Sequence, residues 1–536
     1  MAANHPALTT HLDEQWRDIH FANDEVRCTR YEVTPQAGTL HGLLAEVGGA
    51  VRAVVAEAFA TGQPLRVPGG RWSLSTIGKP RGSMLDLGNY RSIGAVMPQW
   101  LTPQYAALSA QSGVGATLIA AGMTVNVVNR ELAKAGRALK TSGASDGQTF
   151  AGAIATGTHG ADLKVGALHD TVLAVHLVVS PTRSVLIQPA VGALNGEAAS
   201  TLASWFGMPC DLLSDDQLFR AVKVHLGSLG VVLNVVVETV PLYYLDRERT
   251  AHRDGASWRA VLTSRNPKNA NGLHSADPDY LQFIVNPYVP SPETDPRAWM
   301  ISMRKVPYTG QVGVITTPTE SSLKSDLADF LPALVTFYQQ NIELPGNPVL
   351  RLVTSSQLKK IYGANASSTS ALPGAMFGPP DFLGIDFNPV RGASAEYVFD
   401  ATQARLGVET ILDTLASQLA AAQHQYLGGI GIRFVKGSNG WLAPNAKAMN
   451  CFVELQSLHT QELPAIHAAI GAALSQAGVP YGGHWGQWFM NTPQVVERWW
   501  GANAVQSWKA ARADLLPTVA ARDIFASPIL TGAGLG

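Results

Sequence analysis

Hydrophobic and polar positions along this chain predict helices and strands in mixed order. Residues 41–63 place apolar side chains at helical spacing and carry a glycine near their end, so we predict a helix there and a second one over 128–136. The segment 105–127 alternates apolar and β-branched positions broken by glycine, which predicts further strands. Other short apolar runs predict strands at 64–67, 83–87, 171–179, 227–240 and 280–285.

A change in composition after Pro241 indicates more than one domain. Polar, Pro-rich sequence follows, with amphipathic helices expected at 321–340 and 402–422 and a Ser-, Gly- and Pro-rich loop at 363–381 between them. At 536 residues the chain is also too long for one compact core. We therefore predict three parts, with boundaries at 1–242, 243–479 and 480–536, the last rich in tryptophan.

Composition and charge narrow the class of protein. Of the residues, 46% are hydrophobic and 15% are charged, there are 51 glycines, and the formal net charge is -1. A low charged fraction with abundant glycine favours a large enzyme with a well-buried core and many tight turns. The balanced charge provides no field to attract a phosphate backbone, so we do not expect nucleic-acid binding.

The cysteines and the apolar stretches indicate the cellular compartment of the protein. Cys28, Cys210 and Cys451 are scattered and form no CxxC pair, which fits a reducing compartment. Residues 1–17 lack the apolar core of a secretory signal, and the longest apolar stretch, 230–245, is interrupted by polar residues. We therefore expect a cytoplasmic protein that does not interact with membranes.

Two glycine-rich segments carry the strongest chemical signal. Residues 142–166 are crowded with Gly, Ala, Ser and Thr at neither helical nor strand spacing, and 67–73 forms a second glycine loop after a predicted strand. The pyrophosphate of a dinucleotide must be approached closely by backbone N–H groups, which larger side chains would block. One such loop could be an ordinary tight connection, whereas two favour a nucleotide. The sequence has no GxGxxG fingerprint of a Rossmann domain, so the nucleotide is expected to be held in another way.

A family resemblance rests on six segments: RVPGGRWS (66–73), SMLDLGNYRSI (83–93), SGVGATLIAAGMTVNVVNRELAKAGRAL (112–139), SGASDGQTFAGAIATGTHG (142–160), HLGSLGVVLNVVVETVP (225–241) and HWGQWF (484–489). In these segments the chain resembles the vanillyl-alcohol-oxidase, or PCMH-type, family of FAD-linked oxidases, especially its alditol oxidase, aldonolactone oxidase and type II cholesterol oxidase branch. The resemblance implies an α+β protein. It would have an FAD-binding domain of two α+β subdomains (1–242), a substrate (cap) domain with a large antiparallel sheet (243–479), and a C-terminal segment returning to the FAD domain (480–536).

The resemblance also implies FAD as the cofactor and places its contacts in the two glycine-rich loops and at one later strand. By matching position, the expected contacts are Pro68, Gly69, Gly70, Arg71, Trp72, Ser73, Ser142, Gly143, Ser145, Asp146, Thr149, Gly152, Ala153, Thr156, Gly157, Thr158, His159, Gly227 and Val232.

Three departures from the family pattern change the expected chemistry. Many relatives carry a histidine, bonded covalently to the flavin, where this chain has Arg71. We therefore predict non-covalent FAD, with Arg71 either pairing with the pyrophosphate or lying on the surface. Gln487 replaces a family lysine, and Gly431 replaces the acid of a Glu-x-Arg pair. The retained Arg433 is expected to hold a substrate oxygen or a flavin edge, or to be a strand arginine in a salt bridge.

By the same resemblance, the expected reaction is hydride transfer from an alcohol-type substrate to flavin N5, with dioxygen as acceptor and hydrogen peroxide as product. Arg433, His484 and Gln487 are the expected catalytic residues, and His484 or Arg433 would assist removal of the hydroxyl proton. The departures and the tryptophan-rich end suggest an apolar or secondary-metabolite substrate. Gly143 is aligned where a small residue admits dioxygen, whereas a shift by one residue would place Ala144 there and reverse that inference.

Other interpretations remain open at this stage. The missing lysine and acid would also fit an FAD-dependent dehydrogenase with a quinone or carrier-protein acceptor, or a flavin-binding protein with altered chemistry. Residues 143–147 match the GxSxG nucleophile elbow but lack a convincing flanking strand and helix. His159 and His484 lack zinc-ligand spacing, so we expect no metal. His424 and His459 are expected to face solvent or the core.

Overall fold

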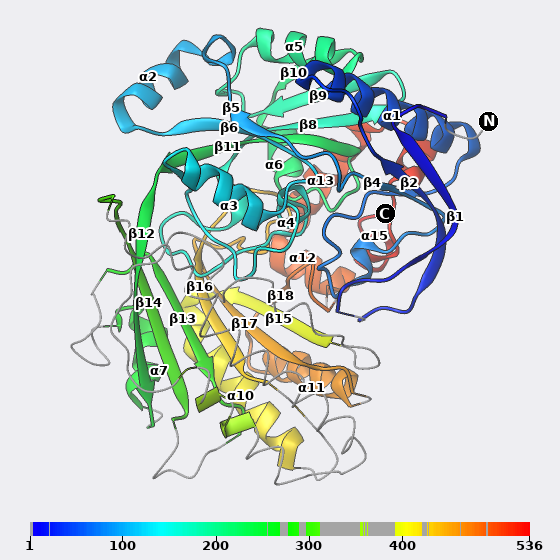
Figure 1. Ribbon diagram of the computed structural model, residues 1–536. Coiled ribbons are helices and arrows are strands. Elements are labelled where there is room, and N and C mark those ends of the chain that lie inside the picture. The colour runs from blue at the N-terminus through cyan, green and yellow to red at the C-terminus, as the bar shows by residue number, and fades with distance from the viewer. Residues whose placement is uncertain are drawn as a thin grey trace.

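The computed structural model describes residues 4–20, 22–253, 256–267, 277–288, 296–310, 354–356, 358–359, 362, 392–420, 426, 428–460, 462–488 and 491–536. Among these residues the strands form three sheets, one with four strands and two with seven. In Figure 1 the first sheet lies beside the N-terminus, the second crosses the top of the molecule, and the third forms the lower half.

The first sheet combines strands from the start of the chain in the order β1-β2-β4-β3. The predicted helix at 41–63 is confirmed as α1 (Leu40–Thr61), which begins after Thr39 and ends at Gly62. The Thr39 side chain accepts from the Gly42 amide, and Gly62 has the left-handed φ of 68° that glycine adopts without steric cost. The strands are β1 (Leu8–Trp16), β2 (Val26–Val33), β3 (Leu65–Arg66) and β4 (Ser83–Asp86).

The second sheet has the order β10-β9-β8-β11-β6-β5, and β7 pairs with β11. Its central strand β11 is valine-rich and almost wholly buried, as expected of a strand covered on both faces. The strands are β5 (Ile93–Ala95), β6 (Gly115–Ala120), β7 (Arg137–Leu139), β8 (Val172–Ser180), β9 (Arg183–Gln188), β10 (Cys210–Ser214) and β11 (Val231–Pro241). The helices beside them are α3 (Val125–Lys134), α5 (Gly196–Phe206) and α6 (Asp216–Lys223).

Two local predictions are wrong. The start of 105–127 lies in a helix, α2 (Pro103–Ser112), because Thr102 caps it, proline occupies its first position and Gly113 ends it in the left-handed conformation. The glycine-rich segment also contains a short helix, α4 (Phe150–Thr156), whose cap is Thr149. These terminal signals outweighed the spacing of the apolar side chains.

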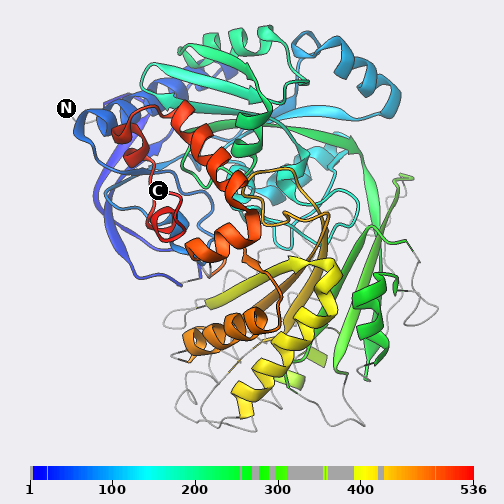
Figure 2. The ribbon, with the colours of Figure 1, turned by 180° about the vertical axis from the view of Figure 1, so that it is seen from behind.

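The third sheet runs β12-β14-β13-β16-β17-β15-β18, and all its printed pairings are antiparallel. The chain passes from β11 of the second sheet to β12 of the third through Leu242 alone. Helices α7 (Ala256–Ser264), α10 (Ala404–Ala420) and α11 (Leu463–Gln476) cover one face of the third sheet (Figure 2). Its strands are β12 (Tyr243–His252), β13 (Tyr280–Val285), β14 (Ala298–Pro307), β15 (Gly392–Asp400), β16 (Ile430–Lys436), β17 (Met449–Leu458) and β18 (Gly482–Gly483).

The C-terminal helices lie against the upper half of the molecule in Figure 2. They are α12 (Pro493–Trp500), α13 (Ala502–Leu515), α14 (Val519–Ile524) and α15 (Pro528–Gly532). The buried Trp508 donates to the Val224 carbonyl and Arg512 to the Ser228 carbonyl, which attaches α13 to the end of α6 and the turn after it.

These sheets and helices confirm the expected α+β fold with its large antiparallel sheet. The helix predicted at 321–340, the loop at 363–381 and His424 lie outside the described residues. The three domain boundaries remain predictions. Among the described helices, none combines the length and apolar character needed to cross a bilayer.

Candidate functional site

The two glycine-rich loops meet in space. A Cβ atom added at Gly69 would lie 2.2 Å from Thr149 Oγ1, and one added at Gly147 would lie 2.0 Å from the Trp72 ring. Contacts this close require glycine, because no real Cβ fits them without displacing its neighbour. The loop after β3 therefore packs directly on the cap of α4, as the paired-loop prediction requires.

A cavity with about 780 Å³ of empty space, including its open mouth, lies at this junction. Glycine and alanine make up much of its wall, so main-chain groups are accessible from inside. The predicted contacts that line it are Pro68, Gly69, Ser73, Thr149, Gly152, Thr156, Gly227 and Val232. The others do not line it, although they lie in the same two loops: Gly70, Arg71, Trp72, Ser142, Gly143, Ser145, Asp146, Ala153, Gly157, Thr158 and His159.

Arg71 is exposed, with a positive φ of 58°. The arginine that lines the cavity is Arg66, which the sequence analysis missed. It is buried and donates to the main-chain carbonyls of Ile77, Leu226 and Gly227 at 2.7, 2.8 and 3.0 Å. Arg66 thus fixes the far wall of the cavity, and its position before the glycine loop in an apolar strand is a signal that could have identified it.

His225 also lines the cavity and was missed. Its Nδ1 accepts from the Gly227 amide at 3.1 Å, and burial lowers its pKa to about 4. The imidazole is therefore neutral near pH 7 and shapes the 225–227 turn without adding charge.

These residues fit FAD. The wall is open to main-chain approach, two of its glycines, Gly227 and Gly230, have positive φ, and the buried Arg66 guanidinium lies within it. Small residues accommodate a flat ligand, and one fixed cation complements its negative charge.

A second group of predicted residues lies where the α4 loop meets the third sheet. His159 Nε2 lies 3.2 Å from Glu396 Oε2, and Arg433 Nη1 donates to Glu396 Oε1 at 3.0 Å. Arg433 Nη2 donates to Glu454, and Gln487 Nε2 donates to Glu454 Oε1 at 3.0 Å. We call these five residues the buried charge cluster. Arg433 is therefore a strand arginine in a salt bridge, with one acid from β15 and one from β17.

Glu396 and Glu454 were missed by the sequence analysis. Each is a buried carboxylate flanked along its strand by buried residues, and that pattern could have identified them. Burial by itself would raise the pKa of Glu396, but His159 and Arg433 lower it well below the usual range. Burial would likewise lower the pKa of Arg433, and the two carboxylates raise it instead.

Both ring nitrogens of His159 face oxygen acceptors. Nδ1 lies 2.9 Å from the Gly160 carbonyl oxygen, and Nε2 faces Glu396. His159 thereby links the main chain after α4 to Glu396 of the third sheet.

His484 does not have the properties of a base. Its Nδ1 accepts from the Gly486 amide at 3.1 Å, its ring is also bonded to the Gly157 main chain, and burial lowers its pKa to about 4. His484, His159 and Glu396 have ligand-type atoms within 4.8 Å of one another. Protein groups already occupy those atoms, and the Arg433 guanidinium beside Glu396 opposes a cation, so we assign no metal to them.

Four of the tryptophans near the C-terminus pack inside the protein. Trp485, Trp499, Trp500 and Trp508 are buried, and their indole N–H groups donate to the carbonyls of Leu442, Pro444, Ala443 and Val224 respectively. These four indoles are therefore engaged in packing, and Trp488 is the member of the set that lines a cavity.

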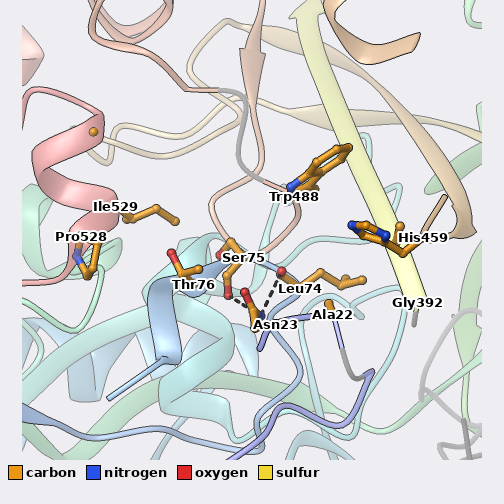
Figure 3. A pocket seen from close by; sticks show the side chains of 12 residues that line it. Ala22, Asn23, Leu74, Ser75, Thr76, Gly392, His459, Trp488, Pro528 and Ile529 are labelled. Atoms are coloured by element: carbon orange, nitrogen blue, oxygen red, sulfur yellow. Dashed lines mark hydrogen bonds between the residues drawn. The ribbon is translucent and has the colours of Figure 1, made fainter. Parts of the chain in front are cut away.

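A second cavity, with about 720 Å³ of empty space, lies between the 74–76 segment, the start of β15 and α15 (Figure 3). Trp488 and the exposed His459 lie on one side of it, with ring centroids 6.2 Å apart. Asn23 donates to the Leu74 carbonyl at 3.2 Å. The polar groups of this wall thus join the N-terminal segment to the chain around Leu74.

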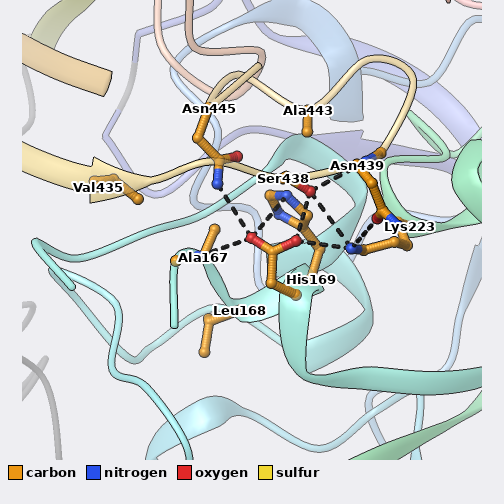
Figure 4. A network of polar contacts seen from close by, with 12 residues as sticks. Ala167, Leu168, His169, Lys223, Val435, Ser438, Asn439, Ala443 and Asn445 are labelled. Carbon is orange, nitrogen blue, oxygen red and sulfur yellow. Dashed lines mark hydrogen bonds and ion pairs between the residues drawn. The ribbon is translucent and has the colours of Figure 1, made fainter. Parts of the chain in front are cut away.

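A polar network joins the second sheet's helices to the loop after β16 (Figure 4). Lys223 Nζ donates to Asp170 at 2.7 Å and to Asn439 Oδ1 at 2.8 Å, and Asn445 donates to Asp170 at 3.1 Å. Burial would raise the pKa of Asp170, but His169 and Lys223 lower it to about 2. These contacts hold the end of α6, in the upper half of the molecule, against the loop after β16, in the lower half. The contact lies beside the buried charge cluster.

Comparison with known proteins agrees with this geometry. Residues 44–185 match the family described as an FAD binding domain. The L-gulonolactone oxidase of Mus musculus is 28% identical over 197 residues, which cover 37% of this chain and 36% of that protein. The L-gulono-1,4-lactone dehydrogenase of Mycobacterium tuberculosis (strain CDC 1551 / Oshkosh) is 25% identical over 235 residues, which cover 44% of this chain and 43% of that protein.

The match thus spans less than half the length of these curated relatives. A solved structure, solvent-stable cholesterol oxidase, shares the fold over 100% of both chains with a TM-score of 0.67 and 14% identity. Residues 44–185 therefore carry an FAD-binding domain, and the chain is similar to L-gulonolactone oxidases and dehydrogenases in sequence and to a cholesterol oxidase in fold.

Proposed function

We propose that this protein is an FAD-dependent oxidase that acts on a CH–OH group and passes the electrons to dioxygen. The observation that carries the proposal is the buried charge cluster, which joins the α4 loop to the third sheet through His159 and Glu396. FAD bound in the cavity would supply the two-electron acceptor. The substrate carbon would lose a hydride and its oxygen a proton, and dioxygen would take up two electrons and two protons as hydrogen peroxide.

The cluster offers complementary groups to a hydroxyl. The Arg433 guanidinium is a fixed donor, and the carboxylates of Glu396 and Glu454 are acceptors. Removing a proton from the hydroxyl leaves negative charge on oxygen, which a buried guanidinium stabilises more strongly than water does. We assign that role to Arg433. His484, which is neutral and bonded to the main chain, is assigned a positioning role.

Non-covalent FAD remains part of the proposal, since Arg71 cannot form the bond that a histidine forms. The substrate is proposed only as an alcohol or a hydroxyl-bearing lactone, because the gulonolactone and arabinonolactone relatives act on lactones by name. A dehydrogenase is the second candidate, favoured by the similarity to L-gulono-1,4-lactone dehydrogenase.

The test is anaerobic mixing of the yellow holoprotein with panels of alcohols, lactones and sterols, followed by loss of the visible flavin band. Admission of air should then restore the band with one peroxide per turnover. Restoration by a quinone but not by air would support the dehydrogenase. Arg433→Met should retain FAD yet slow the bleaching on the order of a hundredfold or more. Protein that stays colourless after FAD is added would contradict the proposal.

A further inference from the structure

Three positions form a row across the third sheet. In the register of the strands, Glu396 of β15 is opposite Glu454 of β17, and Glu454 is opposite Gly431 of β16. Residues directly opposite each other point to the same face of a sheet. Arg433 lies two residues after Gly431 on β16, and so on that face too.

Two carboxylates directly opposite each other are unfavourable unless a cation lies between them. Arg433 meets this need, since one of its terminal nitrogens donates to Glu396 and the other to Glu454. Two of the three positions are acids, Glu396 and Glu454. The third is Gly431, which has no side chain. A Cβ there would lie 3.2 Å from Arg433 Nη2 and 3.7 Å from the Glu454 Cβ.

Glu454 has further partners. Its Oε1 accepts from Gln487 Nε2 and from Ser394 Oγ, both at 3.0 Å. One carboxylate therefore joins Arg433 of β16, Ser394 of β15 and Gln487 of the C-terminal segment. Gly486, beside Gln487, approaches the FAD cavity, because a Cβ at Gly486 would lie 3.2 Å from Thr156 Oγ1.

We propose that Glu454 is a positioning residue that supplies from β17 the acid absent at position 431, and that it holds Arg433 and Gln487 as one unit facing the flavin. The inference rests on the proposed function, since it gives this unit its place in the redox site. Its electrostatic consequence follows from burial: a fixed negative charge near the cofactor opposes reduction, because reduction adds negative charge.

The test is the flavin midpoint potential of the holoprotein, measured by dye equilibration, which needs no substrate. Glu454→Gln should raise the potential by about 30 mV, equivalent to a tenfold change in the equilibrium constant of a two-electron couple. The matched control is Glu497→Gln on α12, where the side chain is exposed, and it should leave the potential unchanged. The double variant Gly431→Glu/Glu454→Gln returns one acid to the row and should restore the wild-type potential.

A potential that does not move in Glu454→Gln would overturn the proposal, and so would a double variant that stays shifted. If Glu454→Gln gives no folded holoprotein, recovery of yellow, soluble protein in the double variant supports the proposal, and its failure to recover counts against it. Failure of the proposed function would be seen separately, as holoprotein with a normal potential that no substrate in the panel reduces.

Discussion

The contact between Gly69 and Thr149 gives the sharpest test of the FAD cavity. Gly69→Ala would place a Cβ 2.2 Å from Thr149 Oγ1, so the threonine must move. That hydroxyl caps α4 by accepting from the Gly152 amide at 3.2 Å, and both Thr149 and Gly152 line the cavity. The substitution therefore changes the shape of the cavity wall itself.

The expected cost follows from the overlap. Overpacking of a rigid site by one methyl group costs about 1–3 kcal/mol, and a lost N-cap costs about 1 kcal/mol. We assign about 2 kcal/mol of this cost to the free energy of FAD binding, which raises the dissociation constant of FAD roughly thirtyfold. In a Thr149→Ala background the oxygen is gone, and the nearest remaining atoms are the residue-149 Cβ at 3.4 Å and the Gly152 Cα at 3.6 Å. There, Gly69→Ala should cost little more.

The assay is titration of apoprotein with FAD, read by quenching of flavin fluorescence, for wild type, both single variants and the double variant. The cycle should show a coupling energy of about 2 kcal/mol between the two positions. Gly94→Ala is the matched control, since a Cβ there meets nothing within 4 Å. The reasoning is refuted if Gly69→Ala binds FAD as wild type does, or if its cost is the same in both backgrounds.

Three further outcomes are expected. Acid precipitation should leave a white pellet and a yellow supernatant, since Arg71 cannot bond covalently to the flavin; a yellow pellet would contradict this. Burial lowers the pKa of His176 to about 3, so its neutral form is favoured by folding, and stability should fall as the pH drops below about 6.5. Between pH 7 and pH 5 His176 by itself should account for a loss of about 2 kcal/mol, and His176→Gln should show that much less pH dependence of unfolding than wild type. Lys223→Met removes the cation from buried Asp170 and should destabilise the protein by about 3 kcal/mol in urea unfolding, whereas Lys134→Met, at an exposed position on α3, should change it little.

Several elements could be predicted because their signals are local. Helix α1 and strand β13 lie where apolar spacing placed them. Helix α2 was mistaken for strand because its caps, Thr102 and Gly113, carry more information than its weak apolar pattern. The loops at 67–73 and 142–166 were found because close main-chain approach to a cofactor requires small residues in sequence.

The partners of Arg433 could not be predicted in this way. Its carboxylates are 37 and 21 residues away along the chain, and they meet it only through strand register. Likewise, the sequence pointed to Arg71 as a phosphate partner, whereas the folded chain places Arg66 in the cavity wall.

By itself, then, the sequence determined the cofactor, because FAD imposes its requirements on short contiguous loops. Tertiary structure decided which charges surround Arg433. An acid is missing at position 431, yet Glu454 contacts the same guanidinium from the neighbouring strand. Pairing between strands brings distant residues onto one face, and no pattern within a single strand carries that information.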